Sequence, residues 1–153
     1  MRITGATSAR NIWVHKLLVD INVILDVAML RAVHSPPSQA VLSLIEQKKA
    51  QGFVGALSLA TIYYLLKKEI HSKEATGYIR KLLQLFSVVE VNRSVIERAL
   101  TIGTRDLEDG IQAACAEACR ADYIVTRDRQ GYQEAEVPVI TPAEYVATFF
   151  TEE

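Results

Sequence analysis

The sequence predicts an α/β fold in which a parallel sheet of about five strands is covered by helices on both faces. Short apolar runs alternate along the chain with segments in which apolar side chains recur at helical spacing. Strands that alternate with helical segments of about ten to fifteen residues are typical of parallel sheets. The chain has 153 residues, half of them apolar, which is enough for one continuous core in a single domain.

Composition narrows the classes of partner. The formal charge is -1, from 17 basic and 18 acidic side chains, so a polyanion must be held by a local patch or by bound metal. No stretch approaches the ~18 apolar residues that a membrane span needs, and we expect a cytoplasmic protein.

Cys115 and Cys119 stand on one face of an Ala-rich helical segment. We expect them to be buried free thiols, which suits a reducing cytosol.

The first strand is expected at residues 17–19, because this apolar run is too short for a free-standing helix. It ends at Asp20, which places an acidic residue at the carboxyl end of a strand, where open α/β sheets position their chemistry. The next helix is expected over residues 23–32. Residues 1–15 lack the apolar centre of a signal peptide and are expected to form a disordered or accessory arm, so the domain is expected over residues 16–150.

The middle of the chain predicts two further strand and helix units. Ser38 is expected to begin a helix after a break at two prolines, and Gly52 to end it before a second strand at residues 53–57. Ser58 is expected to cap the following helix through its hydroxyl. A further helix over residues 72–86 would leave two helices in succession between the second and third strands. The later elements are expected at 87–91 (strand), 95–102 and 108–120 (helices), 122–125 and 137–140 (strands), and from Pro142 onward (helix). Asn92 is expected to cap the helix over 95–102.

Four aspartates fall where such a sheet gathers its strand ends. Asp20 and Asp128 follow strands one and four. Asp109 stands in the first turn of the helix that feeds strand four, and Asp106 lies one turn earlier. If strand four lies beside strand one, across the point where the strand order reverses, these carboxylates converge in one crevice.

Convergence of carboxylates carries an electrostatic cost. Two like charges ~4 Å apart repel by up to ~4 kcal/mol at an effective dielectric of ~20, so several remain ionised together only beside a multivalent cation. Oxygen ligands without His or Cys favour Mg²⁺ or Mn²⁺. Such ions polarise water and stabilise the leaving oxygen in phosphodiester cleavage. The same acids also suit structural roles, because Asp106 and Asp109 resemble acids at a helix N-terminus and Asp128 resembles a turn residue.

Three segments of the chain form an ordered set. They are Leu18-Val19-Asp20-Ile21-Asn22-Val23-Ile24-Leu25-Asp26, Asp106-Leu107-Glu108-Asp109-Gly110-Ile111-Gln112-Ala113-Ala114 and Ala121-Asp122-Tyr123-Ile124-Val125-Thr126-Arg127-Asp128. Together they resemble the signature segments of PIN-domain proteins, and the similarity spans residues 16–150. The resemblance implies a three-layer α/β/α sandwich and a divalent-metal-dependent endoribonuclease, often the toxin of a toxin–antitoxin pair.

The resemblance also implies roles for individual residues. The implied metal-site acids are Asp20, Asp109 and Asp128, the auxiliary catalytic acid is Asp106, and the supporting polar residues are Asn22 and Thr126. One position departs from the family pattern, which usually has a Glu early in the helix after strand two. This chain has Thr61 there, whose hydroxyl can hold a metal-bound water but brings no charge. Two outcomes are therefore open: Asp106 compensates in part for the missing charge, or activity is weak or absent.

The resemblance implies RNA as substrate, expected to be single-stranded, with an antitoxin protein and a second copy of the chain as further partners. Arg127 and Arg129 flank Asp128 and are candidates for contact with a phosphate backbone. Two alternatives remain open. A PIN-fold module that binds RNA or protein without cutting is favoured by Thr61. A haloacid-dehalogenase-like phosphatase also begins with a strand that ends in Asp, but its second acid is here Asn22, which removes the general acid.

Overall fold

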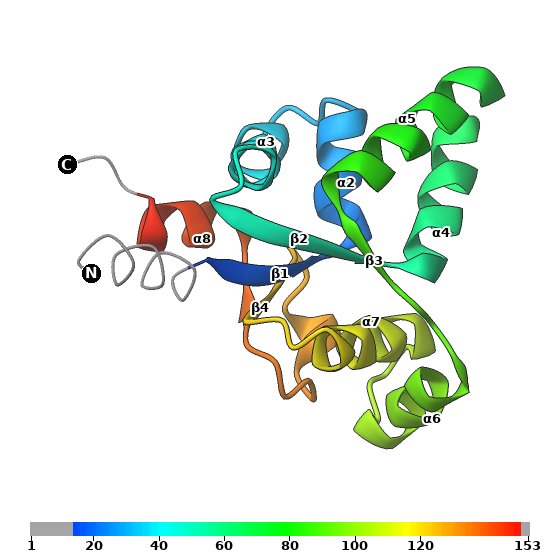
Figure 1. Ribbon diagram of the computed structural model, residues 1–153, viewed down its shortest axis with the longest axis vertical. Coiled ribbons are helices and arrows are strands. Elements are labelled where there is room, and N and C mark those ends of the chain that lie inside the picture. Colours follow the sequence, from blue (N-terminus) through cyan, green and yellow to red (C-terminus); the bar gives the residue numbers. More distant parts are fainter. Residues whose placement is uncertain (1–13, 151–153) are drawn as a thin grey trace, which may run out of the picture.

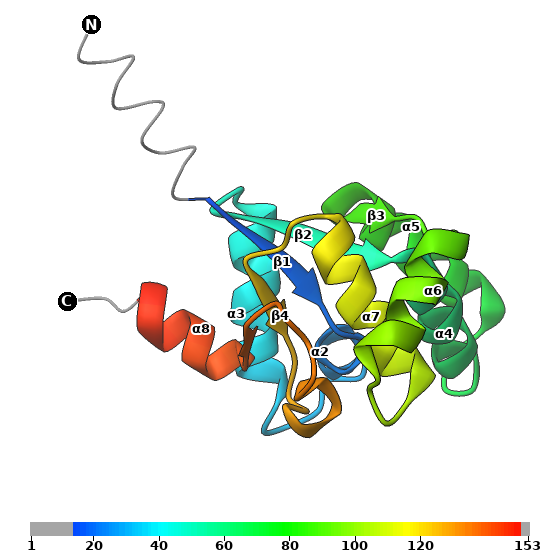
Figure 2. The ribbon, with the colours of Figure 1, turned by 90° about the horizontal axis from the view of Figure 1, so that it is seen from below.

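The computed structural model describes residues 14–150 and shows a five-stranded parallel sheet between two layers of helices (Figures 1 and 2). The strands are β1 His15–Val19, β2 Ala50–Gly55, β3 Ser87–Val89, β4 Tyr123–Val125 and β5 Val139–Ile140. The helices are α2 Ile21–Ala28, α3 Ser35–Glu46, α4 Ala56–Lys67, α5 Ser72–Leu85, α6 Arg93–Ile102, α7 Leu107–Ala118 and α8 Pro142–Phe149, with a 3-10 turn η1 at Gln130–Tyr132. The predicted fold class is confirmed. Of the expected N-terminal arm, residues 1–13 lie outside the described range, and His15 already belongs to β1.

The strand order β3-β2-β1-β4-β5 places strand four beside strand one. Leu18 of β1 pairs with Phe53 of β2 on one side and with Ile124 of β4 on the other, in both cases in parallel. The chain builds outward from β1 to β3 and then returns to the opposite side of β1 to form β4 and β5. The order therefore reverses between β1 and β4, as the sequence predicts for a ligand-binding crevice.

Alternation along β1 divides the core between the two faces of the sheet. Leu17 and Val19 pack with buried residues of α2, α3, α4, α5 and α8, whereas Leu18 packs with α6 and α7. Figure 1 shows these two helical layers on opposite sides of the sheet. Successive side chains of a strand point to opposite faces, so the buried run of β1 needs cover on both sides. As predicted, α4 and α5 lie in succession between β2 and β3.

Two predictions near β2 are wrong, the helix cap at Ser58 and the helix end at Gly52. The helix after β2 begins at Ala56 with Gly55 as its N-cap, so Ser58 lies inside the helix. Inside the helix, the Ser58 hydroxyl donates to the side chain of Gln112 on α7. Gly52 lies within β2 and does not end a helix. A β-carbon at Gly52 would stand 2.7 Å from the Phe86 ring, so close packing of the ring requires the glycine.

Helix α3 begins three residues earlier than predicted, at Ser35. Pro36 and Pro37 are accommodated in its first turn, where the backbone N–H groups have no helical partner. Ser38 lies inside the helix, and its buried hydroxyl donates to Asp26. The predictions that Ser38 begins a helix and that Ser58 caps one failed for the same reason. Each serine hydroxyl donates to a side chain of another element.

Two other sequence predictions are confirmed. Asn92 caps α6, with its side-chain oxygen accepting from Val95 N at 3.0 Å. Cys115 is buried and Cys119 half-buried, and both are free thiols. Burial raises the pKa of the Cys115 thiol to about 11, which keeps it protonated at neutral pH. Among residues 14–150, no helix combines the length and the apolar character needed to cross a bilayer.

Candidate functional site

Asp20 lies at the carboxyl end of β1 and serves as the N-cap of α2. Its carboxylate is 8% exposed and accepts from Ile21 N and from Thr126 Oγ1, each at 2.7 Å. Gln112 Nε2 and Asn22 Nδ2 lie farther away, at 3.4 Å. These donors are neutral, so they orient the Asp20 carboxylate without cancelling its charge.

Asn22 and Thr126 tie the end of β1 to the end of β4. Asn22 Nδ2 donates to Thr126 Oγ1 at 3.2 Å. The buried Thr126 hydroxyl donates to Asp20 and accepts from the backbone N–H of Asp128 at 3.0 Å. A single hydroxyl therefore contacts both candidate acids, which are far apart in the sequence. Asn22 and Thr126 therefore both contact Asp20, and the supporting role expected of them stays a prediction.

Asp109 and Asp128 approach each other beside the turn η1. A β-carbon at Gly131 would stand 2.7 Å from Asp109 Oδ2 and 3.1 Å from Asp128 Oδ2. Gly131 N also donates to Asp128 Oδ1 at 3.3 Å. The absence of a side chain at Gly131 therefore leaves space between two carboxylates. An ion with oxygen ligands fits such a space better than a methyl group does.

The pKa of Asp109 shows that the other three predicted acids lie near it. Its pKa is raised to about 6, first by burial and then by the charges of Asp20, Asp106, Asp128 and Glu108. Asp106 is the N-cap of α7 and accepts from Glu108 N at 2.8 Å. The predicted gathering of acids at one edge of the sheet is thus present. Between residues 14 and 150, however, no three His, Cys, Asp or Glu side chains close up into a ready-made metal site.

The two arginines beside Asp128 already have partners. Arg127 makes a bidentate contact with Asp26, from Nε to Oδ2 at 2.7 Å and from Nη2 to Oδ1 at 3.0 Å. Arg129 pairs with Glu144 near the start of α8. A phosphate group would have to compete with these carboxylates. Contact of either arginine with RNA therefore stays a prediction.

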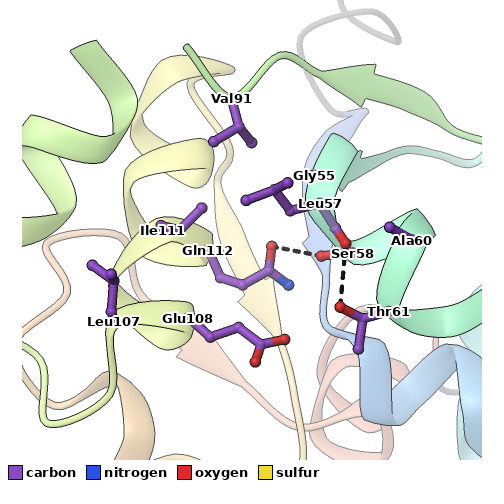
Figure 3. A pocket seen from close by; sticks show the side chains of 10 residues that line it. All are labelled: Gly55, Leu57, Ser58, Ala60, Thr61, Val91, Leu107, Glu108, Ile111 and Gln112. Carbon is purple, nitrogen blue, oxygen red and sulfur yellow. Dashed lines mark hydrogen bonds between the residues drawn. The ribbon is translucent and has the colours of Figure 1, made fainter. Parts of the chain in front are cut away.

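Thr61 lines a pocket between α4 and α7, which we call the α4–α7 pocket. Its volume is about 360 Å³. The Thr61 hydroxyl donates to the carbonyl of Leu57 at 3.3 Å. Figure 3 shows the Glu108 side chain directed into the pocket from α7, with Gln112 farther along the same helix. Since Gln112 also donates to Asp20, this residue connects the pocket with the acid cluster.

Comparison with protein families tests the resemblance carried by the three sequence segments around Asp20, Asp109 and Asp128. A family model described as PIN domain matches residues 16–130. The chain belongs to the PIN-domain family. PIN domains are typically metal-dependent nucleases, and the phosphatase alternative is accordingly set aside. A comparison with curated proteins gave no match.

Solved structures of similar fold include toxin–antitoxin proteins. FitAcB from Neisseria gonorrhoeae is 22% identical, with a TM-score of 0.64 over 82% of this chain and 97% of that chain. A toxin–antitoxin complex from Klebsiella pneumoniae is 22% identical, with a TM-score of 0.65 over 84% and 98%. VapBC2 from Rickettsia felis, bound to a DNA fragment from its promoter, is 12% identical, with a TM-score of 0.65 over 82% and 98%. At these identities the likeness concerns the fold.

Tyr132 lies beside the acid cluster of this PIN domain, and sequence reasoning missed it. Its side chain is 2% exposed, and its hydroxyl makes no hydrogen bond of acceptable geometry to another described residue. Burial, followed by nearby Asp20 and Asp109, raises the pKa of this phenol far above its ordinary value. The Tyr132 hydroxyl therefore lies beside the Asp20 and Asp109 carboxylates. A buried hydroxyl without a partner is costly, and this one lies beside the acid cluster.

Gln112 was also missed, although its position offered a signal. It follows Asp109 by three residues, so both lie on one face of α7. Its buried side chain accepts from Ser58 Oγ at 3.0 Å and donates to Asp20. Tyr132 offered no comparable signal, because a tyrosine in an irregular segment is most simply explained as packing.

Proposed function

We propose that this PIN domain is a divalent-metal-dependent endoribonuclease, with Mg²⁺ or Mn²⁺ held by Asp20, Asp109 and Asp128. The observation that carries the proposal is the space beside Gly131, where two of these carboxylates come together at the reversal of strand order. The donor set consists of hard oxygens, which suits these ions. A bound ion would polarise the scissile phosphodiester and offset the charge of the leaving oxygen.

The protein's own groups have defined parts in this proposal. Thr126 and Asn22 fix the direction of the Asp20 carboxylate through hydrogen bonds. Asp109, whose pKa is raised to about 6, is the acid whose ionisation depends most on a neighbouring cation. The Tyr132 hydroxyl is a buried donor available to an oxygen that enters the site. Asp106, the N-cap of α7, adds negative charge close to Asp109.

Solved relatives of similar fold support a protein partner. The Klebsiella pneumoniae structure is a toxin–antitoxin complex, and we propose that this chain likewise pairs with an antitoxin protein. We also propose that it acts on single-stranded RNA in the cytosol and forms a homodimer. Size-exclusion chromatography with light scattering tests the dimer directly, and a mass equal to one chain would overturn that part.

A binding module that does not cleave is the second candidate function. Thr61 favours it, because the family's usual Glu is absent there and the site lacks one negative charge. The two candidates differ in one measurable respect. Both bind RNA, but cleavage at added Mn²⁺ is expected of the nuclease alone.

Cleavage of end-labelled single-stranded RNA, measured in chelator and again with Mn²⁺ in excess over the chelator, tests the proposal. We expect metal-dependent cleavage by the native chain and a loss of about a thousandfold in Asp20→Asn, since a metal ligand supplies several kcal/mol of transition-state stabilisation. Glu134→Gln, which alters an exposed acid outside the cluster, is the control. Cleavage that persists unchanged in Asp20→Asn would overturn the assignment and indicate a contaminating nuclease.

A further inference from the structure

The α4–α7 pocket shares a wall with the acid cluster. Gln112 forms that wall, because its Oε1 accepts from Ser58 in the pocket and its Nε2 donates to Asp20 in the cluster. A nucleotide with its phosphate at the aspartates would therefore direct a neighbouring base toward the pocket. A volume of about 360 Å³ lies near the lower end of the ~300–1,000 Å³ of small-molecule sites, a size that suits one nucleoside.

The pocket has apolar sides that suit a flat ring. Leu57 of α4 and Leu107 and Ile111 of α7 line it from opposite helices (Figure 3). Leu57 is 50% exposed and Leu107 48% exposed, although both are large apolar side chains. A planar base placed between these side chains would remove apolar surface from water, which favours binding.

The polar side chains of the pocket offer a ligand chiefly acceptors, because the Gln112 amide already donates to Asp20. Glu108 directs its carboxylate inward (Figure 3) and makes no side-chain hydrogen bond or ion pair with another residue in the described range. The hydroxyl protons of Thr61 and Ser58 are already donated to Leu57 and Gln112. A ligand that fits this pocket must therefore bring N–H donors of its own, and must bring two to use both oxygens of the carboxylate.

We infer that the α4–α7 pocket binds a guanine base of the RNA and that Glu108 recognises it, an inference that rests on the proposed ribonuclease function. Among the RNA bases, guanine has two adjacent N–H donors on its Watson–Crick edge, which match the two oxygens of a carboxylate. Adenine and cytosine have one amino donor beside an acceptor, and uracil has one imino donor between acceptors. Acceptors that face a carboxylate repel it, so Glu108 selects against those bases as well as for guanine.

Free nucleosides test the pocket without metal and without phosphate. The full-length, ¹⁵N-labelled chain is titrated in chelator with guanosine, inosine, adenosine and cytidine, and the backbone amide signals are followed by NMR. We expect guanosine to shift signals of residues 57–61 and 107–112. Inosine lacks the 2-amino group of guanosine and loses one hydrogen bond to a charged acceptor, so its affinity should be about tenfold lower.

Two matched variants complete the test. Glu108→Gln should lower guanosine affinity about tenfold and remove the preference over inosine. Glu74→Gln changes the corresponding first-turn acid of α5, which is not part of the pocket lining, and should leave the titration unchanged.

Equal responses to all four nucleosides, shifts that lie outside the pocket, or an unaltered guanosine titration in Glu108→Gln would each overturn the inference. These outcomes are separate from failure of the proposed function. Mn²⁺-dependent RNA cleavage by the native chain, measured on the same preparation, can persist when guanosine does not bind. If the native chain neither cleaves RNA nor binds guanosine, both proposals fall.

Discussion

Asp20 and Asp26 lie close together in the sequence at the two ends of α2, but the tertiary structure treats their charges in opposite ways. Asp26 is 0% exposed and is surrounded by cationic and hydroxyl donors from three other segments. These donors are Ser38 at 3.1 Å, Arg31 at 3.2 Å and Arg127 at 2.7 and 3.0 Å. Asp20 meets neutral donors and other carboxylates.

This difference separates structural charge from functional charge. The negative charge of Asp26 is compensated within the chain, so its network ties α2 to α3 and to the segment after β4. The charges of Asp20, Asp109 and Asp128 repel one another, and the cost is reduced by protonation or by a cation. Carboxylates that the chain itself leaves uncompensated are candidates for ligand binding.

The largest expected effect is on stability, through the Asp26 network. Asp26→Asn leaves two arginines without their carboxylate, and we expect a loss of about 3 kcal/mol in the free energy of unfolding, as for one partner of a buried ion pair. Urea denaturation measures it. Glu97→Gln, which removes an exposed ion pair with Arg93, is the control and should cost no more than ~0.5 kcal/mol. Equal losses in the two variants would mean that the buried Asp26 network stabilises the fold no more than an exposed ion pair does.

The second prediction concerns the pH dependence caused by Asp109. Its folded-state pKa of about 6 lies above the ordinary 3.8, so the folded chain binds this proton more tightly than the unfolded chain does. The resulting stabilisation is complete below pH 3.8 and is lost as the pH rises through about 6. Asp109→Asn should therefore flatten this part of the Tm profile and raise the Tm at pH 7 in chelator.

Mn²⁺ provides the matching measurement. In the native chain it should raise the Tm at pH 7, because binding to the folded state stabilises it by mass action. In Asp109→Asn that gain should shrink. A Tm of the native chain that is identical with and without millimolar Mn²⁺ would count against a functional metal site.

The third prediction tests the charge missing at Thr61. Thr61→Glu should tighten Mn²⁺ binding by about tenfold, since an added carboxylate near a multivalent cation is worth on the order of 1 kcal/mol at a partly exposed site. It should also raise RNA cleavage. Thr61→Val keeps the shape of the side chain and is the control. Calorimetry that finds no gain in affinity for a folded Thr61→Glu would show that position 61 does not face the acids.

The smallest expected effect compares two buried tyrosines. Tyr132→Phe removes a hydroxyl without a partner and should stabilise the metal-free chain by about 1 kcal/mol, while it weakens Mn²⁺ binding. Tyr145→Phe removes a hydroxyl that pairs with His15 Nδ1 at 3.0 Å and should destabilise by a similar amount. Chemical denaturation in chelator compares them. A loss of stability in both variants would mean that the Tyr132 hydroxyl is satisfied within the protein.

Local pattern was sufficient to predict much of the architecture. Periodicity gave the order of strands and helices, and Asn92 was recognised as a cap because capping depends on a contact three residues away. The position of Asp20 followed from an apolar run that ends at an acid. Convergence of the acids was predicted on the condition that strand four lies beside strand one, and the pairing of β1 with β4 meets that condition.

Only the tertiary structure decided what the side chains pair with. Arg127 is a candidate for phosphate contact by sequence, but the fold presents it to Asp26, 101 residues away. Ser58 suits a helix cap, but Gln112 lies 54 residues away and receives its hydroxyl. Gly131 and Tyr132 could be linked to the site only from the structure, because the fold packs η1 beside carboxylates from distant segments. The sequence by itself determined which segments form strands and helices and where acids fall at their ends, since these depend on neighbours along the chain. Whether the charge of an acid is compensated within the chain depends on contacts between distant segments, and only the tertiary structure decides those contacts.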